Sequence, residues 1–530
     1  MSLTDRIAQG LAAGWKVTDA TTLTTDQTHE ADVVVIGTGA GGGTTAEILA
    51  RAGLSVILVE EGRLYYQKDF RMDELTAYAA LYQEGMSRVT RDGAIAILQG
   101  RCVGGSTTVN WTSSFRTPDA TLNHWADRFG LDDLRPEAMT PWFAGREQRH
   151  NIAPWATDPN VNNDILRQGC EQLGYSWAVI PRNVKGCWNL GYCGVGCPTN
   201  AKQGALTTTI PGALDHEARL FHGLRAERLV MRQDRVDHLI ASALAADGVT
   251  PSGVSVTLRA RHFVVAASAI GSPGLLLRSD IPDPYQRLGK RTFLHPVNGT
   301  VAQMPQQTDP YYGAPQSIYS DHFNFSSGVA GPVGFKLEVP PLHPAMAAGI
   351  VPGYGEDQRD TLGKLPWLQS VIALLRDGFH EDSPGGTVSL RDDGSPVLDY
   401  PLTDYLWEGL RRAFRTMAEI QFAAGAERVR LIHLDSPWFR SWKEARGAID
   451  ALPMKPHRVR LFTAHQMGGC GMGADPRESV VNSFGEHHQV TNLSLHDASI
   501  FPTSIGANPQ LSVYGLAARN STRLAARLRS

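Results

Sequence analysis

The feature that most constrains this chain is a short apolar strand that leads into a glycine turn and then into a helix. Residues 32–36 read DVVVI, a β-branched run typical of a buried parallel strand. Gly37, Gly39 and Gly42 follow in the spacing G-x-G-x-x-G, and residues 44–53 read TTAEILARAG, which predicts a helix that ends at a glycine. Glycines at such a turn let the backbone approach a pyrophosphate, and the helix N-terminus supplies amide donors for it.

A second strand and an acid complete this pattern. Residues 55–59 read SVILV and lead directly to Glu60, 23 positions after Gly37. Dinucleotide-binding folds carry an acid about 20 positions after the glycines, where its carboxylate accepts a hydrogen bond from the adenosine ribose. The order of elements predicts a Rossmann-like nucleotide-binding domain, with a tight βα turn without a ligand as the alternative. It does not distinguish NAD from FAD.

Charge and hydropathy argue against several classes of protein. The net charge is −3 and the pI is near 6.6, and no run of Lys and Arg occurs, so nucleic acid is not expected as a partner. No apolar run reaches the length of about 18 residues that a transmembrane helix needs. The N-terminal residues lack the apolar core of a secretory signal. A cytoplasmic protein without a transmembrane segment is therefore expected.

Further segments place small residues beside apolar ones. Residues 100–110 read GRCVGGSTTVN, residues 263–279 read FVVAASAIGSPGLLLRS, and residues 464–473 read AHQMGGCGMG. Residues 505–511 read IGANPQL and precede a helical pattern. Small side chains after a strand suit a chain that passes close to a dinucleotide.

These segments, together with GTGAGG and Glu60, resemble the glucose-methanol-choline (GMC) oxidoreductases, a family of FAD enzymes, from one end of the chain to the other. In the GGC and GANP details the sequence is similar to cholesterol oxidase and long-chain alcohol oxidases. The resemblance implies FAD as the cofactor, a small-molecule alcohol as the substrate, and oxygen or another electron acceptor as the second partner. A lyase on the same scaffold and a flavin-binding sensor without turnover are the alternatives.

The resemblance also implies which residues carry the chemistry. HQMGG looks like the catalytic histidine motif of the family, which assigns His465 as the base that takes the alcohol proton, a task that suits a neutral imidazole. Asn508 matches the second catalytic position, where an amide would hold the substrate oxygen. From the residues alone, a hydrogen-bonded core histidine and a turn-capping asparagine are the other readings.

Contacts with the cofactor are implied at six more positions. By this resemblance, Gly105, Ser106 and Asn110 are expected to lie along the flavin. Val230 is expected to contact the adenine through its backbone. Asp497 and Ala498 are expected to bring backbone amides to the pyrophosphate and the flavin ring.

The implied fold is mixed α/β, with a Rossmann-like FAD-binding domain and an inserted substrate-binding lobe built on an antiparallel sheet. The FAD-binding domain is expected to be discontinuous, from residues 1–130, 200–298 and 456–530. Residues 131–199 and 299–455 are expected to form the substrate-binding lobe.

Within the expected lobe, residues 391–404 fit two short extended pieces around a turn, and residues 405–426 fit an amphipathic helix. Aromatic and aliphatic residues are frequent between residues 300 and 455, so a hydrophobic primary or secondary alcohol is the expected substrate, although the same residues could form ordinary core.

Three cysteines lie close together in the sequence, at Cys187, Cys193 and Cys197. Sugar dehydrogenases of the same family carry an iron–sulfur cluster on similarly spaced cysteines, which would imply a sugar or polyol dehydrogenase. Buried cysteines or one disulfide are the favoured interpretation, and no metal site is expected.

Overall fold

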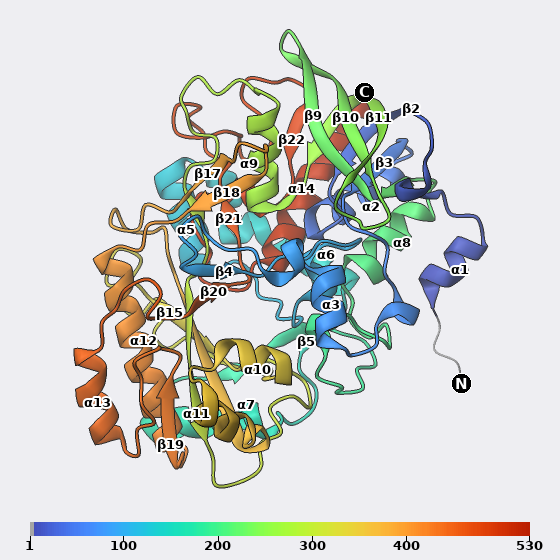
Figure 1. Ribbon diagram of the computed structural model, residues 1–530. Helices are drawn as coiled ribbons and strands as arrows, with labels where there is room; N and C mark the ends of the chain where they lie inside the picture. Colours follow the sequence, from blue (N-terminus) through green and yellow to red (C-terminus); the bar gives the residue numbers. More distant parts are fainter. Residues whose placement is uncertain (1–4) are drawn as a thin grey trace.

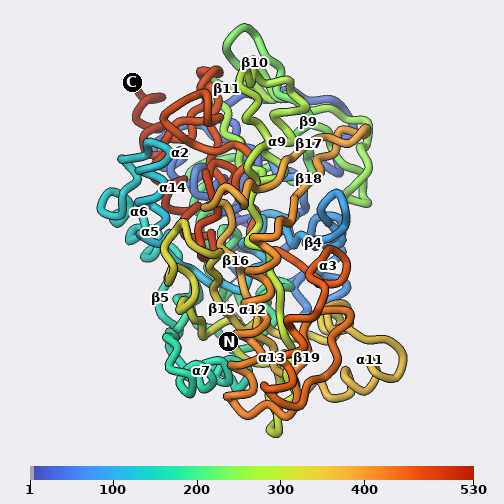
Figure 2. The backbone as a smooth tube through the Cα atoms, turned by 90° about the vertical axis from the view of Figure 1, so that its left-hand side faces the viewer, coloured from blue at the N-terminus to red at the C-terminus, as the bar shows by residue number. Residues whose placement is uncertain are grey.

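The computed structural model of the protein describes residues 5–530, which form two large sheets with helices packed around them (Figure 1). The labelled strands of the first sheet lie in the upper part of Figure 1, and those of the second lie below them, from the middle of the picture (β4, β20) to the lower left (β19). Figure 2, turned by 90°, shows the same separation between β9–β11 and the region of β19 and α12. The mixed α/β fold predicted from the sequence is confirmed.

The first sheet has eight strands, and its parallel part is the predicted nucleotide-binding core. In spatial order the strands are β1 (Val17–Asp19), β8 (Arg219–His222), β3 (Val56–Glu60), β2 (Gln27–Ile36), β11 (Pro251–Val265), β10 (Arg235–Leu244) and β9 (Leu224–Arg232), with β22 (Leu493–Leu495) also paired to β11. β1, β8, β3, β2, β11 and β22 pair in parallel, whereas β10 pairs antiparallel with both β11 and β9.

The sequence around the glycine turn forms the elements that its pattern predicts. β2 ends in four buried apolar residues, β3 is buried throughout, and α2 (Ala40–Arg51) lies between them. β-Branched residues buried on both faces are what a central parallel strand requires. Against α2 pack the C-terminal helix α14 (Gln510–Arg529) and the short α8 (Thr209–Leu214).

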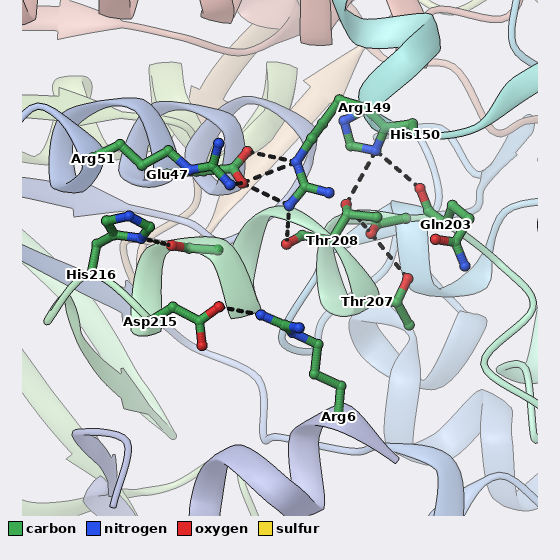
Figure 3. A network of polar contacts seen from close by, with 12 residues as sticks. Arg6, Glu47, Arg51, Arg149, His150, Gln203, Thr207, Thr208, Asp215 and His216 are labelled. Carbon is green, nitrogen blue, oxygen red and sulfur yellow. Dashed lines mark hydrogen bonds and ion pairs between the residues drawn. The ribbon is translucent and has the colours of Figure 1, made fainter. Parts of the chain in front are cut away.

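A buried ion pair joins α2 to its neighbours (Figure 3). Glu47 of α2 is almost fully buried, and its carboxylate accepts hydrogen bonds from Nε and Nη2 of Arg149, at the end of α6 (Pro136–Arg149). The same Nη2 donates to the carbonyl of Thr208 at the start of α8, and the more exposed Arg51 also pairs with Glu47. Because a buried carboxylate without a partner is costly, these contacts hold α2, α6 and α8 in one arrangement.

The second sheet also has eight strands and is mainly antiparallel. In spatial order the strands are β4 (Ile95–Ile97), β20 (Leu461–Thr463), β13 (Val297–Gln303), β16 (Leu368–Leu375), β15 (Phe335–Glu338), β14 (Ile318–Ser320) and β6 (Ala178–Val179), with β19 (Arg428–Leu431) also paired to β13. Only the pairing of β20 with β4 is parallel within this sheet.

One long helix covers this sheet. α12 (Asp404–Ala423) packs on β13, β16 and β19 and beside α7 (Val161–Leu173), and its buried residues recur at helical spacing. The amphipathic helix predicted for residues 405–426 is therefore confirmed. Of the two extended pieces predicted within residues 391–404, one is the strand β18 (Pro396–Asp399). Its hairpin partner β17 (Thr387–Leu390) ends just before this range, and the hairpin packs against α9 (Ser268–Arg278).

Strands of the two sheets alternate along the sequence more often than the expected domain limits imply. β4 and β20 belong to the second sheet but lie in ranges expected for the FAD-binding domain, and β13 begins at Val297, just before the expected limit at residue 298. The domain limits themselves stay a prediction.

Shorter elements complete the described chain. The remaining helices are α1 (Arg6–Ala12), α3 (Glu74–Leu81), α4 (Ser106–Val109), α5 (Asp119–Phe129), α10 (Pro344–Ile350), α11 (Gly355–Leu362) and α13 (Trp442–Ala451), and the remaining strands are β5 (Ile152–Pro154), β7 (Pro181–Asn183), β12 (Thr292–Phe293) and β21 (Met467–Gly468). None of the helices between residues 5 and 530 combines the length and the apolar character needed to cross a bilayer.

Candidate active site

A cavity of about 950 Å³ is lined by residues of both sheets. At one end lie the glycine turn after β2 and the carboxyl end of β3, and at the other end lie His465 and Asn508. The carboxyl ends of the parallel strands β2, β3, β11 and β22 all meet at this cavity, which is where open α/β sheets bind their ligands.

The glycine turn places free backbone amides against the cavity. Gly39 is the N-cap of α2, and no side chain caps this helix, so its first amides face the cavity without a side-chain partner. Gly37 has φ +100°, and a Cβ there would collide with the carbonyl oxygen of Ala266. Gly42 does not line the cavity; its missing Cβ leaves room for the carbonyl of Gly37, so this glycine serves the contact between helix and strand.

Glu60 closes the same end of the cavity at the last position of β3. Its carboxylate accepts hydrogen bonds from the Thr38 amide (3.1 Å), the Thr38 hydroxyl (2.6 Å) and the Gly62 amide (2.9 Å). Burial raises the pKa of Glu60 to about 7, although these hydrogen bonds act in the opposite direction. The acid expected at the ribose is thus held firmly at the cavity wall.

The segment expected along the flavin also lines the cavity. Gly105 has φ +54°, and a Cβ there would lie 2.9 Å from the Cα of Gly39, so the two glycine turns meet. The Ser106 hydroxyl accepts from the Gly100 amide at 3.0 Å, and the Asn110 amide donates to Gln510 Oε1 at 2.8 Å. All three predicted residues border the cavity.

Asp497 and Ala498 follow β22 and border the cavity as well. The Asp497 carboxylate accepts from the Ser268 amide (2.8 Å), the Ser272 hydroxyl (2.5 Å) and the Ser499 amide (2.7 Å). The side chain therefore fixes the loop to the start of α9, which leaves the backbone to face a ligand.

Val230 is not at the cavity. β9 reaches the cavity with its first residues, Leu224 to Glu227, and a register shift against β10 separates them from Val230. The part of β9 that lines the cavity thus lies three or more residues before Val230, because the sequence does not reveal where along a long strand the cavity begins. The hairpin of β17 and β18, expected in the substrate lobe, lines the cavity near the same end through residues 393–396.

At the other end of the cavity the structure brings His465 and Asn508 together. Asn508 Nδ2 lies 3.5 Å from His465 Nε2 and donates to Glu338 Oε2 at 3.2 Å. Burial lowers the pKa of His465 to about 4, so its imidazole is neutral at pH 7. Within residues 5–530 no group donates to Asn508 Oδ1, which is buried.

Two buried residues behind this pair were not found from the sequence. His295 Nδ1 lies 3.2 Å from His465 Nδ1, and Glu338 contacts Asn508. Burial raises the pKa of Glu338 to about 7, while the attraction of Lys336 and the hydrogen bond from Asn508 lower it. The only sequence signal for Glu338 is an acid in an otherwise strand-like segment, FKLE.

The wall beside His465 is apolar. Val297, Ile372, Leu374 and Phe462 lie on neighbouring strands of the second sheet, form one hydrophobic cluster, and line the cavity. An apolar wall with a few polar groups at one point is typical of a small-molecule site.

The three neighbouring cysteines do not form a metal centre in the structure. Cys187, Cys193 and Cys197 are free and partly buried, so no disulfide joins them. Across residues 5–530 no group of three or more His, Cys, Asp or Glu side chains is arranged to hold a metal ion. The structure gives the iron–sulfur interpretation no geometric support.

The chain belongs to the GMC oxidoreductase family: the N-terminal family model matches residues 78–297 and the C-terminal model matches residues 382–517. A long-chain-alcohol oxidase from Arabidopsis thaliana is 27% identical over 94% of this chain and 67% of its own length. A GMC-type oxidoreductase from Mycobacterium tuberculosis is 33% identical over 92% of this chain and 74% of its own.

Solved structures share the fold. Pyridoxine 4-oxidase from Mesorbium loti superposes with a TM-score of 0.68 at 18% identity and covers 93% of this chain and 98% of its own. Formate oxidase from Aspergillus oryzae gives a TM-score of 0.70 at 15% identity, with 95% of this chain and all of its own covered.

The residues at the cavity fit FAD. Two glycine turns leave room for a pyrophosphate, the uncapped helix α2 offers amides to it, and a buried acid stands where a ribose hydroxyl would bind. The protein is an FAD-dependent oxidoreductase of the GMC family that acts on CH–OH donors.

Replacing Gly39 should separate cofactor binding from folding. A Cβ at Gly39 would meet no protein atom closer than the Gly105 Cα at 3.9 Å, so the fold tolerates it, yet it would enter the space of the pyrophosphate. We expect Gly39→Ala to weaken FAD binding tenfold or more, about 1.4 kcal/mol, with an unchanged Tm of the apoprotein. The measurement is the ratio of bound flavin to protein as the apoprotein is titrated with FAD.

Gly145→Ala is the matched control, because a Cβ at this position of α6 meets nothing within 4 Å and lies away from the cavity. Equal FAD affinity of Gly39→Ala and Gly145→Ala would contradict the placement of the cofactor.

Glu338 should make stability depend on pH. Its pKa rises from 4.5 to about 7 on folding, so the native state favours the protonated form. Ionisation therefore destabilises the native state progressively as pH rises from about 4.5 to 7, by on the order of 3 kcal/mol at pH 8. We expect Glu338→Gln to raise Tm more at pH 8 than at pH 5 in thermal unfolding of the apoprotein. An equal change in Tm at pH 5 and pH 8 would contradict the burial of a neutral acid at this position. So would an equally large difference between the two pH values in the control variant Glu356→Gln, which alters an exposed acid.

Proposed function

We propose that the protein oxidises a hydrophobic primary or secondary alcohol to an aldehyde or ketone. The observation that carries this proposal is the apolar cluster of Val297, Ile372, Leu374 and Phe462 directly beside the polar pair at the cavity end. Burial of a hydrocarbon chain there would contribute about 0.8 kcal/mol per CH₂ group. The relative named as a long-chain-alcohol oxidase supports the same substrate class.

His465 and Asn508 are the residues at the alcohol oxygen in this proposal. Bound FAD supplies the acceptor for the hydride of the alcohol carbon. His465 and Asn508 both hydrogen-bond to the alcohol oxygen and hold it in place. Gly37, Gly39 and Glu60 would hold the nucleotide part of FAD, and oxygen or another electron acceptor would close the cycle.

The segments around Gly105, Ser106, Asn110, Asp497 and Ala498 complete the proposed cofactor site. The alternative, a lyase on this scaffold, uses the same oxygen-binding pair but needs no change in the redox state of the flavin. The absorbance of the flavin therefore separates the two functions.

Anaerobic bleaching of the visible flavin band tests this function directly. We expect fatty and steroid alcohols to bleach the band, and sugar alcohols to do so poorly, because the wall beside His465 offers no polar partners. Leu374→Ser should slow bleaching by long-chain alcohols more than by short-chain alcohols, since only a long chain needs this wall. Turnover of an alcohol without bleaching would support a lyase, and preference for sugars would contradict the proposed substrate class.

A further inference from the structure

The two histidines at the cavity end are brought together by strand register. β12 pairs antiparallel with β21, with Thr292 opposite Gly468 and Phe293 opposite Met467. Continuing this register two residues beyond Phe293 and two before Met467 places His295 opposite His465. Their Nδ1 atoms are 3.2 Å apart and the rings are nearly perpendicular, at 84°.

Hydrogen bonding fixes the proton on His295. The backbone amide of Gly506 donates to His295 Nε2 at 3.0 Å, so this nitrogen is an acceptor and carries no proton. His295 is fully buried, and burial lowers its pKa well below the usual value, with smaller contributions from His465, Lys336 and Arg376 in the same direction. A neutral imidazole has one N–H, which in His295 must therefore be on Nδ1.

The proton on His295 then decides the tautomer of His465. Because His295 Nδ1–H points at His465 Nδ1, the latter must accept, and the single proton of neutral His465 lies on Nε2. Nε2 faces Asn508, whose Nδ2 also carries protons. Two donors do not bond to each other, and this contact, at 3.5 Å, is indeed longer than those of His465 with His295 and of Asn508 with Glu338, which are both 3.2 Å.

We propose that His295 is a positioning residue that holds His465 as the Nε2–H tautomer, so that His465 meets the alcohol oxygen as a hydrogen-bond donor. This inference rests on the proposed function for the identity of the ligand, but the tautomer itself does not depend on turnover. It differs from the role of base that the sequence motif predicts for His465.

The backbone of His295 is held for this purpose by a buried acid. His295 has φ +44°, unusual for a residue with a side chain. Asp377 accepts hydrogen bonds from the amides of Leu294 (3.0 Å) and His295 (3.1 Å), and the Tyr400 hydroxyl donates to it at 2.6 Å. These bonds offset the cost of the left-handed conformation and keep the ring directed at His465.

The tautomer has a consequence for the reaction. Nε2–H of His465 stabilises the negative charge that grows on the alcohol oxygen, and it stays bonded to the carbonyl oxygen of the product. The hydroxyl proton leaves to water in the cavity, because His465 Nε2 already holds a proton and Nδ1 is occupied by His295.

Nitrogen NMR of the holoenzyme with ¹⁵N-labelled histidine tests the tautomer without any substrate. We expect the His465 signals, assigned by their absence in His465→Gln, to show a protonated Nε2 and an unprotonated Nδ1. His295→Gln should retain this pattern, because its amide can accept from Gly506 and donate to His465. His295→Leu can do neither and should give a mixture of tautomers. A protonated Nδ1 in the wild type would overturn the proposal.

The kinetics of flavin reduction test the donor role separately. We expect His465→Ala to reduce the flavin about 10²-fold or more slowly, and His465→Gln, which keeps an N–H donor, to recover at least about tenfold of that loss. Equal loss in both variants would overturn the donor role. If no alcohol reduces the flavin of the wild type, the proposed function fails, while the NMR result still decides the tautomer.

Discussion

The structure depends on one close contact between backbones at the carboxyl edge of the first sheet. A Cβ at Gly37 would collide with the carbonyl of Ala266, a Cβ at Gly42 with the carbonyl of Gly37, and a Cβ at Gly41 with the carbonyl of His496. Strands β2, β11 and β22 can therefore converge on the start of α2 only because these positions lack side chains. Because these strands converge, the amides at the start of α2 and the Glu60 carboxylate border the same end of the cavity. The ion pair of Glu47 with Arg149 holds α2 in that position.

The second sheet supplies the reacting end of the same cavity. Its strands β13, β16 and β20 contribute the apolar wall. His295, just before β13, and His465, just after β20, stand at its edge. The chain thus separates its tasks: one sheet holds the nucleotide, and the other offers a hydrocarbon surface with a small polar group at its end. In our proposal, two kinds of buried hydrogen bond behind that group decide how it presents its protons: those that Asp377 accepts from backbone amides, and the one that the Gly506 amide donates to His295.

The elements that sequence alone could predict are those encoded locally. The glycine spacing, the strand that leads to Glu60 and the helix over the second sheet follow from short-range patterns, and the structure contains all three. His465 and Asn508 are 43 positions apart, yet the family resemblance indicated both, and the structure brings them within contact.

Other parts could not be predicted because they depend on register and long-range pairing. Val230 was expected at the cavity, but the register shift in β9 gives that place to earlier residues of the strand. His295 is 170 positions from His465 in sequence, and only the pairing of β12 with β21 shows that they meet. A proton on one nitrogen of an imidazole is set by such a neighbour, so no motif around His465 could reveal it.

In the function that we propose, the carbinol carbon of a hydrophobic alcohol gives its hydride to FAD in this cavity. The most direct test is stopped-flow reduction of the flavin, without oxygen, by a long-chain primary alcohol with hydrogen or deuterium at the carbinol carbon. We expect deuterium to slow the bleaching of the flavin, because that C–H bond breaks in the step observed. Bleaching at the same rate with both isotopes would point to a different limiting step, and the absence of bleaching with hydrophobic alcohols would contradict the account.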